Sequence, residues 1–127
     1  MKPARPKRTR QRAAAKAHVP NLSDADVKTI QERIGYSFKD RDLLVRALTH
    51  PSAVASADSV RLSNQRLEFL GDRVLNLTIA ERLIERRKTE SEGDLAPRLN
   101  RFVRKGACAE AVRHFGLQDY IILSDGE

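Results

Sequence analysis

The stretch from Asn64 to Leu75 constrains the fold most, because its apolar side chains recur at helical spacing around most of a helix. At about 100° per residue, the polar side chains of this stretch gather on one narrow stripe. That stripe consists of Gln65, Glu68, Asp72 and Asn76. We expect a mostly buried helix with a polar slot in its N-terminal half. It should run to about Arg87, where charged side chains show that it emerges into water.

Two carboxylates, Glu68 and Asp72, lie four residues apart on that stripe. On a helix their Cβ atoms would be about 5–6 Å apart, close enough for the two charges to repel each other. Neighbouring carboxylates without a basic partner usually bind a cation. The alternative is that both acids are solvated at the surface, or that they pair with Arg66 and Arg73. Taken alone, the spacing favours this alternative.

From residue 22 onward the pattern predicts helices almost throughout, and no alternating strand pattern appears. We therefore expect an all-α fold, a helical bundle around the central helix. Residues 53–63 should form a surface loop, and residues 117–123 an extended or one-turn segment. End signals predict one helix between Ser23 and Gly35, one from Lys39 or Asp40 to Pro51, one over 95–105 with Asp94 as cap and Pro97 in its first turn, and one over 107–115.

The positive charge is concentrated at the N-terminus. Seven of the 24 basic residues precede residue 18 with no acid among them, which leaves 17 basic and 17 acidic residues in the remainder. We expect residues 1–21 to be a disordered basic tail before a single folded domain over 22–127. Such a tail either aids solubility or neutralises several phosphates in a salt-sensitive way that does not depend on sequence. The basic residues concerned are Arg5, Lys7, Arg8, Arg10 and Arg12.

Composition also bears on location. No apolar run approaches the roughly 18 residues that span a bilayer, and no apolar segment near the N-terminus is typical of a secretory signal. The single cysteine, Cys108, excludes an internal disulfide and a zinc cluster, and is expected to be a small buried residue. These features predict a soluble, cytoplasmic protein with no membrane partner.

Residues 66–72, Arg-Leu-Glu-Phe-Leu-Gly-Asp, resemble the signature of the ribonuclease III family, endonucleases that cut double-stranded RNA using magnesium. Two further blocks lie at matching distances. They are Ala-Leu-Thr-His-Pro-Ser over 47–52 and Glu-Gly-Asp-Leu over 92–95. The resemblance runs from about Val27 to Glu127. It implies a ribonuclease III-type catalytic domain built around a signature helix.

The resemblance implies roles for several residues. Glu68 and Asp72 would be catalytic ligands of Mg2+, with Mn2+ as a substitute and no organic cofactor. Gln65 stands where the signature often has Glu, and Glu92 matches an acidic position near the cleavage groove, although its charge also suits the start of a helix. Arg73 replaces a commoner small residue and should point away from the metal, to form a salt bridge or reach RNA.

Phe69 would insert into the second subunit of a homodimer whose paired sites receive duplex RNA. Next to a helix-ending proline, His50 is interpreted as a packing or capping residue in preference to a catalytic base.

Family members carry a further helix with an Asp-x-x-Glu pair and usually a double-stranded-RNA-binding domain, and neither occurs before Glu127. We expect an incomplete catalytic domain that is inactive or weakly active alone. The first hypothesis is an endoribonuclease that processes ribosomal RNA precursors and structured messenger RNA. The second is a non-catalytic RNA-binding or ribosome-associated relative, and the third is a plain helical interaction module.

Overall fold

The computed structural model describes residues 19–125, and helices follow one another through most of that range. The tail residues Arg5, Lys7, Arg8, Arg10 and Arg12 lie outside the described residues. The α-helices are α1 (Asp24–Ile34), α2 (Arg41–Leu48), α3 (Ser59–Leu62), α4 (Gln65–Arg86), α5 (Glu92–Val103) and α6 (Lys105–His114), and short 3-10 turns occur at η1 (Pro51–Ala53), η2 (Ser56–Asp58) and η3 (Gln118–Tyr120). Within the described range, β-structure is limited to one isolated bridge, which confirms the all-α prediction. None of the helices between residues 19 and 125 has both the length and the apolar character needed to cross a membrane.

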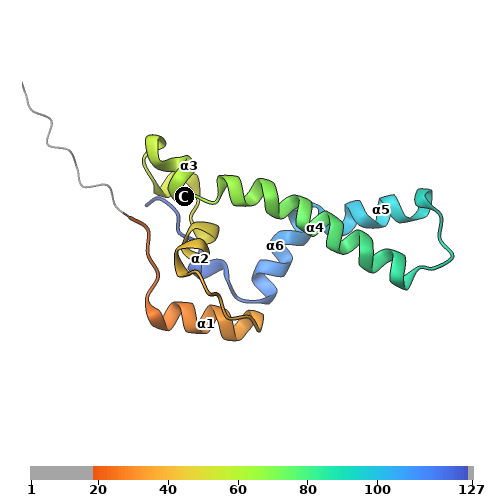
Figure 1. Cartoon of the computed structure of the whole chain (residues 1–127), viewed down its shortest axis with the longest axis horizontal. Coiled ribbons are helices and arrows are strands. Elements are labelled where there is room, and N and C mark those ends of the chain that lie inside the picture. Colours follow the sequence, from red (N-terminus) through yellow and green to blue (C-terminus); the bar gives the residue numbers. More distant parts are fainter. Residues whose placement is uncertain (1–18, 126–127) are drawn as a thin grey trace, which may run out of the picture.

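The hydrophobic core lies where α1 and α2 pack together with the C-terminal segment (Figure 1). Both helices form as their end signals predict. The Ser23 hydroxyl accepts a hydrogen bond from the Asp26 amide, Gly35 ends α1 at a φ of 68°, and Asp40 caps α2. The buried residues of this core are Leu22, Ile30, Leu44 and Val45, and Leu117, Tyr120 and Ile122 pack against them.

A junction around Thr49 connects this core to the start of α4. Thr49 has no exposed surface, and its carbonyl accepts a hydrogen bond from the Asn64 amide at 2.8 Å. The His50 amide donates to the Ile122 carbonyl at 2.9 Å, and the Ile122 amide donates to the Leu48 carbonyl at 2.8 Å. One set of backbone hydrogen bonds therefore holds the end of α2, the start of α4 and the C-terminal segment.

Residues 53–63 form short helical turns where a surface loop was predicted. The Ser63 side chain is fully buried, and its hydroxyl donates to the Ser59 carbonyl at 2.6 Å. Small polar residues often indicate a loop, but here a hydroxyl satisfies a nearby backbone carbonyl and supports a tight helical turn. Asn64 follows as the N-cap residue of α4, without a capping hydrogen bond from its side chain.

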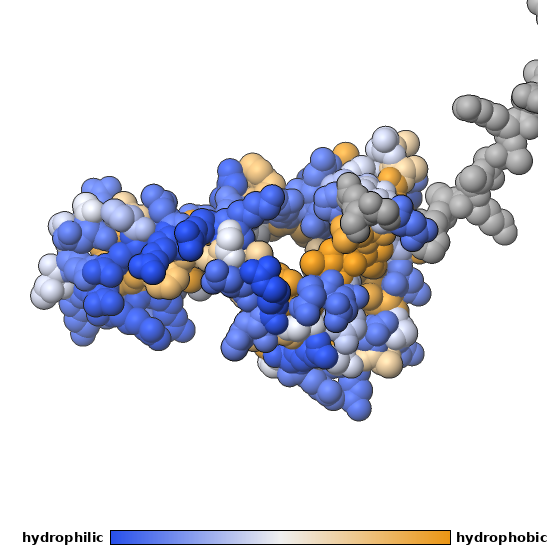
Figure 2. Space-filling model, turned by 180° about the vertical axis from the view of Figure 1, so that it is seen from behind, coloured by the Kyte–Doolittle hydropathy of each residue, from blue (hydrophilic) through white to orange (hydrophobic). Residues whose placement is uncertain are grey.

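Helix α4 extends away from the core as one arm of a hairpin with α5 (Figure 1). The prediction that it is mostly buried is wrong, because Leu83 is its only buried residue and Leu77 is 73% exposed. The reason is that α5 is the helix that packs along α4, so other apolar faces of α4 remain open. Figure 2 shows hydrophobic residues at the edge of an opening through the middle of the molecule.

Helix α5 begins three residues before the predicted start. Ser91 is its N-cap, and the Asp94 carboxylate accepts hydrogen bonds from the Ser91 amide and hydroxyl. Asp94 therefore completes a capping box and is not the cap itself. These hydrogen bonds, the one from the Ser91 side chain first, hold the pKa of Asp94 below its usual value. Pro97 consequently lies in the second turn and not in the first.

Truncating an apolar side chain should cost more stability in the core than on α4. Ile30 is 1% exposed, whereas Ile84 on α4 is 63% exposed. Ile30→Ala should lower the free energy of unfolding by about 2–5 kcal/mol, because a cavity is left in the core. Ile84→Ala is the matched control and should change it by less than about 0.5 kcal/mol. Urea unfolding measures both, and equal losses would show that α4 is as well packed as the core.

Candidate functional site

Glu68 and Asp72 face the same cavity, as their spacing on α4 requires. The cavity has a volume of about 530 Å3 and lies between α4, the end of α5 and the start of α6. Its walls are formed by Glu68, Gly71, Asp72, Leu75, Val103, Lys105 and Cys108. The two acids therefore share a space that is open to solvent and partly apolar.

The two carboxylates have different surroundings. Asp72 accepts a hydrogen bond from Arg73 at 2.9 Å and a longer one from the Asn76 side chain at 3.3 Å. Within residues 19–125, Glu68 has no ion-pair partner, and its side chain remains available. Of the two predicted ligands at the cavity, Asp72 is thus paired with Arg73, whereas Glu68 is not paired with a basic side chain of the described residues.

The donor set fits part of a magnesium site. Mg2+ is usually held by one or two carboxylates and keeps several waters, which a solvent-open cavity allows. In the part of the chain that the structure describes, no three His, Cys, Asp or Glu side chains are grouped closely enough to hold a metal. Glu68 and Asp72 would therefore supply the protein ligands that this region contributes.

Arg73 does not point away from Asp72, so its predicted direction is wrong, whereas the salt bridge also expected of it is confirmed. Its Nη1 atom lies 2.9 Å from Asp72 Oδ2, and its guanidinium carbon lies 4.1 Å from the centre of the Phe69 ring. The prediction followed the backbone angle between neighbouring residues. A long helical side chain instead folds back over the preceding turn, which here carries Phe69.

The other predicted groove residues are spread along the hairpin. Gln65 is the first residue of α4 and is exposed, while Glu92 is the first residue of α5. Because α5 starts at the far end of the hairpin, Glu92 lies away from Glu68 and Asp72 within this chain (Figure 1). Its position in the first turn of α5 suits the helix dipole.

His50 is found in the capping role that the sequence favoured. Its Nδ1 atom accepts a hydrogen bond from the Ser52 amide at 3.1 Å, at the start of η1. The Ser52 hydroxyl lies 2.7 Å from the same nitrogen. The imidazole therefore helps to shape the turn after α2.

Lys105 and Cys108 are the cavity residues that sequence reasoning missed. They belong to the start of α6, and nothing in their spacing shows that this part of α6 faces α4. Cys108 is only partly buried, in contrast to the buried position expected for it.

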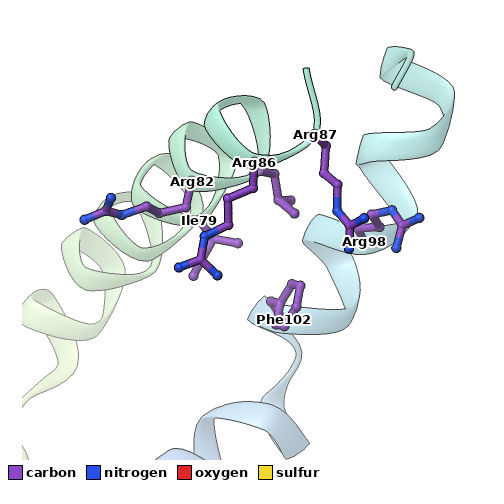
Figure 3. Close-up of a pocket in the computed structure, with 7 residues that line it drawn as sticks. Ile79, Arg82, Arg86, Arg87, Arg98 and Phe102 are labelled. Carbon is purple, nitrogen blue, oxygen red and sulfur yellow. The ribbon is translucent and has the colours of Figure 1, made fainter. Parts of the chain in front are cut away.

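A second cavity, of about 460 Å3, lies near the far end of the hairpin. Figure 3 shows Arg87, just after α4, approaching Arg98 of α5, while Arg82 points away from α5. Glu90 pairs with Arg98 at 2.8 Å and with Arg87 at 3.8 Å, so part of this positive charge is balanced. At 1.5 Å per residue, Arg86 of this cavity is about 21 Å along α4 from Asp72, so this arginine lies well away from the acid pair.

Comparison with known proteins agrees with the motifs and the fold. A family model described as ribonuclease-III-like matches residues 40–127. Ribonuclease 3 of Ruegeria pomeroyi is 50% identical over 103 residues, which cover 81% of this chain and 44% of that protein. Ribonuclease 3 of Phenylobacterium zucineum is 50% identical over 104 residues, covering 82% and 43%. The chain thus spans less than half the length of these relatives.

The nuclease domain of ribonuclease III from Campylobacter jejuni has a similar fold. It superposes with a TM-score of 0.71 at 35% identity, over 77% of this chain and 65% of that one. The matched family model covers more than half of this chain and includes α4 with both acids. The chain therefore belongs to the ribonuclease-III-like family.

Proposed function

We propose that this chain provides metal-binding acids of an endoribonuclease that hydrolyses double-stranded RNA with Mg2+. The observation that carries the proposal is the placement of Glu68 and Asp72 on one cavity of α4, in a chain of this family. Precursors of ribosomal RNA and structured messenger RNA are the substrates we propose, in the cytoplasm, with no membrane partner and no organic cofactor.

Phosphodiester hydrolysis develops negative charge on the attacking and leaving oxygens. A bound Mg2+ stabilises that charge and lowers the pKa of a bound water, and Mn2+ has similar ligand preferences. In this chain Glu68 and Asp72 would hold the ion on a rigid helix. Gln65 and Arg73 on α4 would contact RNA beside them, while Glu92 would line the groove elsewhere.

A homodimer fits the exposed face of α4. Phe69 is 66% exposed, three residues before Asp72, and so offers a large apolar contact beside the acid pair. The related Campylobacter jejuni nuclease domain has a structurally flexible region involved in dimer formation. Two copies related by a two-fold axis would place equivalent acid pairs opposite one another, one for each strand of a duplex.

A non-catalytic RNA-binding relative is the second candidate. The ion pair between Asp72 and Arg73 favours it, because an occupied carboxylate is less available to a metal. Gln65 is an uncharged amide at a position where an acid would add negative charge beside the metal site. Metal-dependent cleavage by the complete protein separates the two candidates.

Removal of either proposed ligand should abolish cleavage. In the complete protein, Asp72→Asn and Glu68→Gln should each lower the rate of duplex RNA cleavage by more than about 100-fold, because a metal ligand contributes several kcal/mol. RNA affinity should stay within about threefold, since the surrounding surface is kept. Single-turnover cleavage and filter binding measure the two quantities.

Glu81→Gln is the matched control, because Glu81 is another exposed acid on α4 outside the cavity. The Glu81→Gln variant should cleave duplex RNA at the wild-type rate. Gln65→Glu should change that rate only mildly. Near-normal cleavage by both ligand variants would refute the assignment of Glu68 and Asp72.

The N-terminal tail is proposed to contact RNA phosphates in a sequence-independent way. Deleting residues 2–16 of the complete protein should weaken duplex binding and flatten its dependence on salt, by a slope of about 1 for each phosphate that the tail neutralises. Affinity measured from low to moderate salt tests this. An unchanged slope would leave the tail as a solubility feature.

Loss of the Phe69 ring should weaken the proposed dimer. Phe69→Ala in the complete protein should raise the dimer dissociation constant by at least about 100-fold, because truncating a buried Phe costs about 3–5 kcal/mol. Sedimentation equilibrium measures this constant. Leu77→Ala, on another exposed turn of α4, is a control for the removal of apolar surface in general. A wild-type protein that stays monomeric at micromolar concentration would contradict the dimer.

A further inference from the structure

Arg73 contacts two residues to which the proposed function gives different tasks. Its Nη1 atom donates to Asp72 Oδ2 at 2.9 Å, and its guanidinium lies over the Phe69 ring with 4.1 Å from its carbon to the ring centre. The same nitrogen is also 3.4 Å from the Phe69 carbonyl oxygen. One guanidinium therefore joins a proposed metal ligand to the proposed dimer contact.

Both contacts can be broken at modest cost. The side chains of Arg73 and Asp72 are 59% and 54% exposed, and the Phe69 ring also faces solvent. Exposed ion pairs and exposed cation–π contacts each shift an equilibrium by up to about fivefold. The two contacts of Arg73, here called the latch, are thus weak enough for a stronger competitor to displace the guanidinium.

Each proposed ligand of this face competes with Arg73. A Mg2+ ion at Asp72 would compete with Arg73 for the charge of the carboxylate whose Oδ2 atom Arg73 Nη1 contacts. A partner subunit that buries Phe69 would compete with the guanidinium for contact with the ring. Once one of them has displaced Arg73, the other no longer has to do so.

We propose that Arg73 is a positioning residue that couples metal binding at Asp72 to burial of Phe69. The inference rests on the proposed metal site and dimer, and adds a link between them. With Arg73 in place, Mg2+ strengthens dimerisation and dimerisation strengthens Mg2+ binding, and thermodynamic linkage makes the factor for each subunit the same in both directions. The expected factor is about three- to tenfold, given the strength of the two contacts.

The test measures binding without RNA or cleavage. Sedimentation equilibrium of the complete protein gives the dimer dissociation constant with and without Mg2+, and calorimetry gives the Mg2+ affinity. In the wild type, Mg2+ should lower the dimer dissociation constant about 10- to 100-fold, which is the square of the factor for each subunit because a dimer has two sites. Arg73→Gln should bind Mg2+ more tightly as a monomer and should lose this effect of Mg2+.

Two variants separate the latch from simple charge repulsion. Arg73→Lys keeps the positive charge near the metal but lacks the planar group that stacks on Phe69, so its coupling should fall towards one. Arg82→Gln is the matched control, because Arg82 forms an exposed pair with Glu85 at 3.2 Å on the same helix. It should retain wild-type coupling.

The outcomes distinguish this inference from the proposed function. Equal Mg2+ effects on dimerisation in the wild type and in Arg73→Gln would overturn the inference, as would the absence of any effect in the wild type. If Asp72→Asn binds Mg2+ as the wild type does, the metal site itself is wrong. Loss of coupling in both Arg73 variants but not in Arg82→Gln supports the latch.

Discussion

The rest of the structure depends on the hydrogen bonds around the buried residue Thr49. Its carbonyl fixes the Asn64 amide just before α4, while its hydroxyl donates to the Val45 carbonyl at 2.7 Å. Helix α4 buries little of its own surface, so few side-chain contacts would hold its first turns in place. Because Glu68 lies within one turn of Asn64, this junction determines where the acid pair sits relative to the core.

The sequence predicted those parts of the fold that local chemistry determines. Ser23 and Asp40 begin helices because their side chains accept hydrogen bonds from backbone amides in the first turn. Gly35 ends α1 because it adopts a left-handed backbone conformation. The start of α5 was misplaced because Ser91 and Asp94 are both good capping residues, and only the folded geometry shows which one is outside the helix. Burial of α4 was overestimated, since periodicity reveals an apolar face but not whether a neighbour covers it.

The candidate site, like the fold, was predictable where it depends on residues close together in the sequence. Glu68 and Asp72 belong to one helix, so their spacing placed them together, and the resemblance supplied the metal-binding role that is proposed for them. Lys105 enters the cavity through the packing of α6, which no spacing along the chain encodes. Arg73 was misassigned because a backbone angle locates Cβ, whereas a flexible side chain sets the position of its charge.

The pairing of His50 with Ile122 has a consequence for the order of folding. These residues are separated by most of the domain, and closing such a long loop is entropically slow compared with forming a helix. During synthesis from the N-terminus, α1, α2 and α4 can all form before Ile122 is made, but the junction at Thr49 cannot be completed. The hydrogen bonds between the end of α2 and the C-terminal segment thus form late, so a nascent chain carries its helices before it carries a complete core.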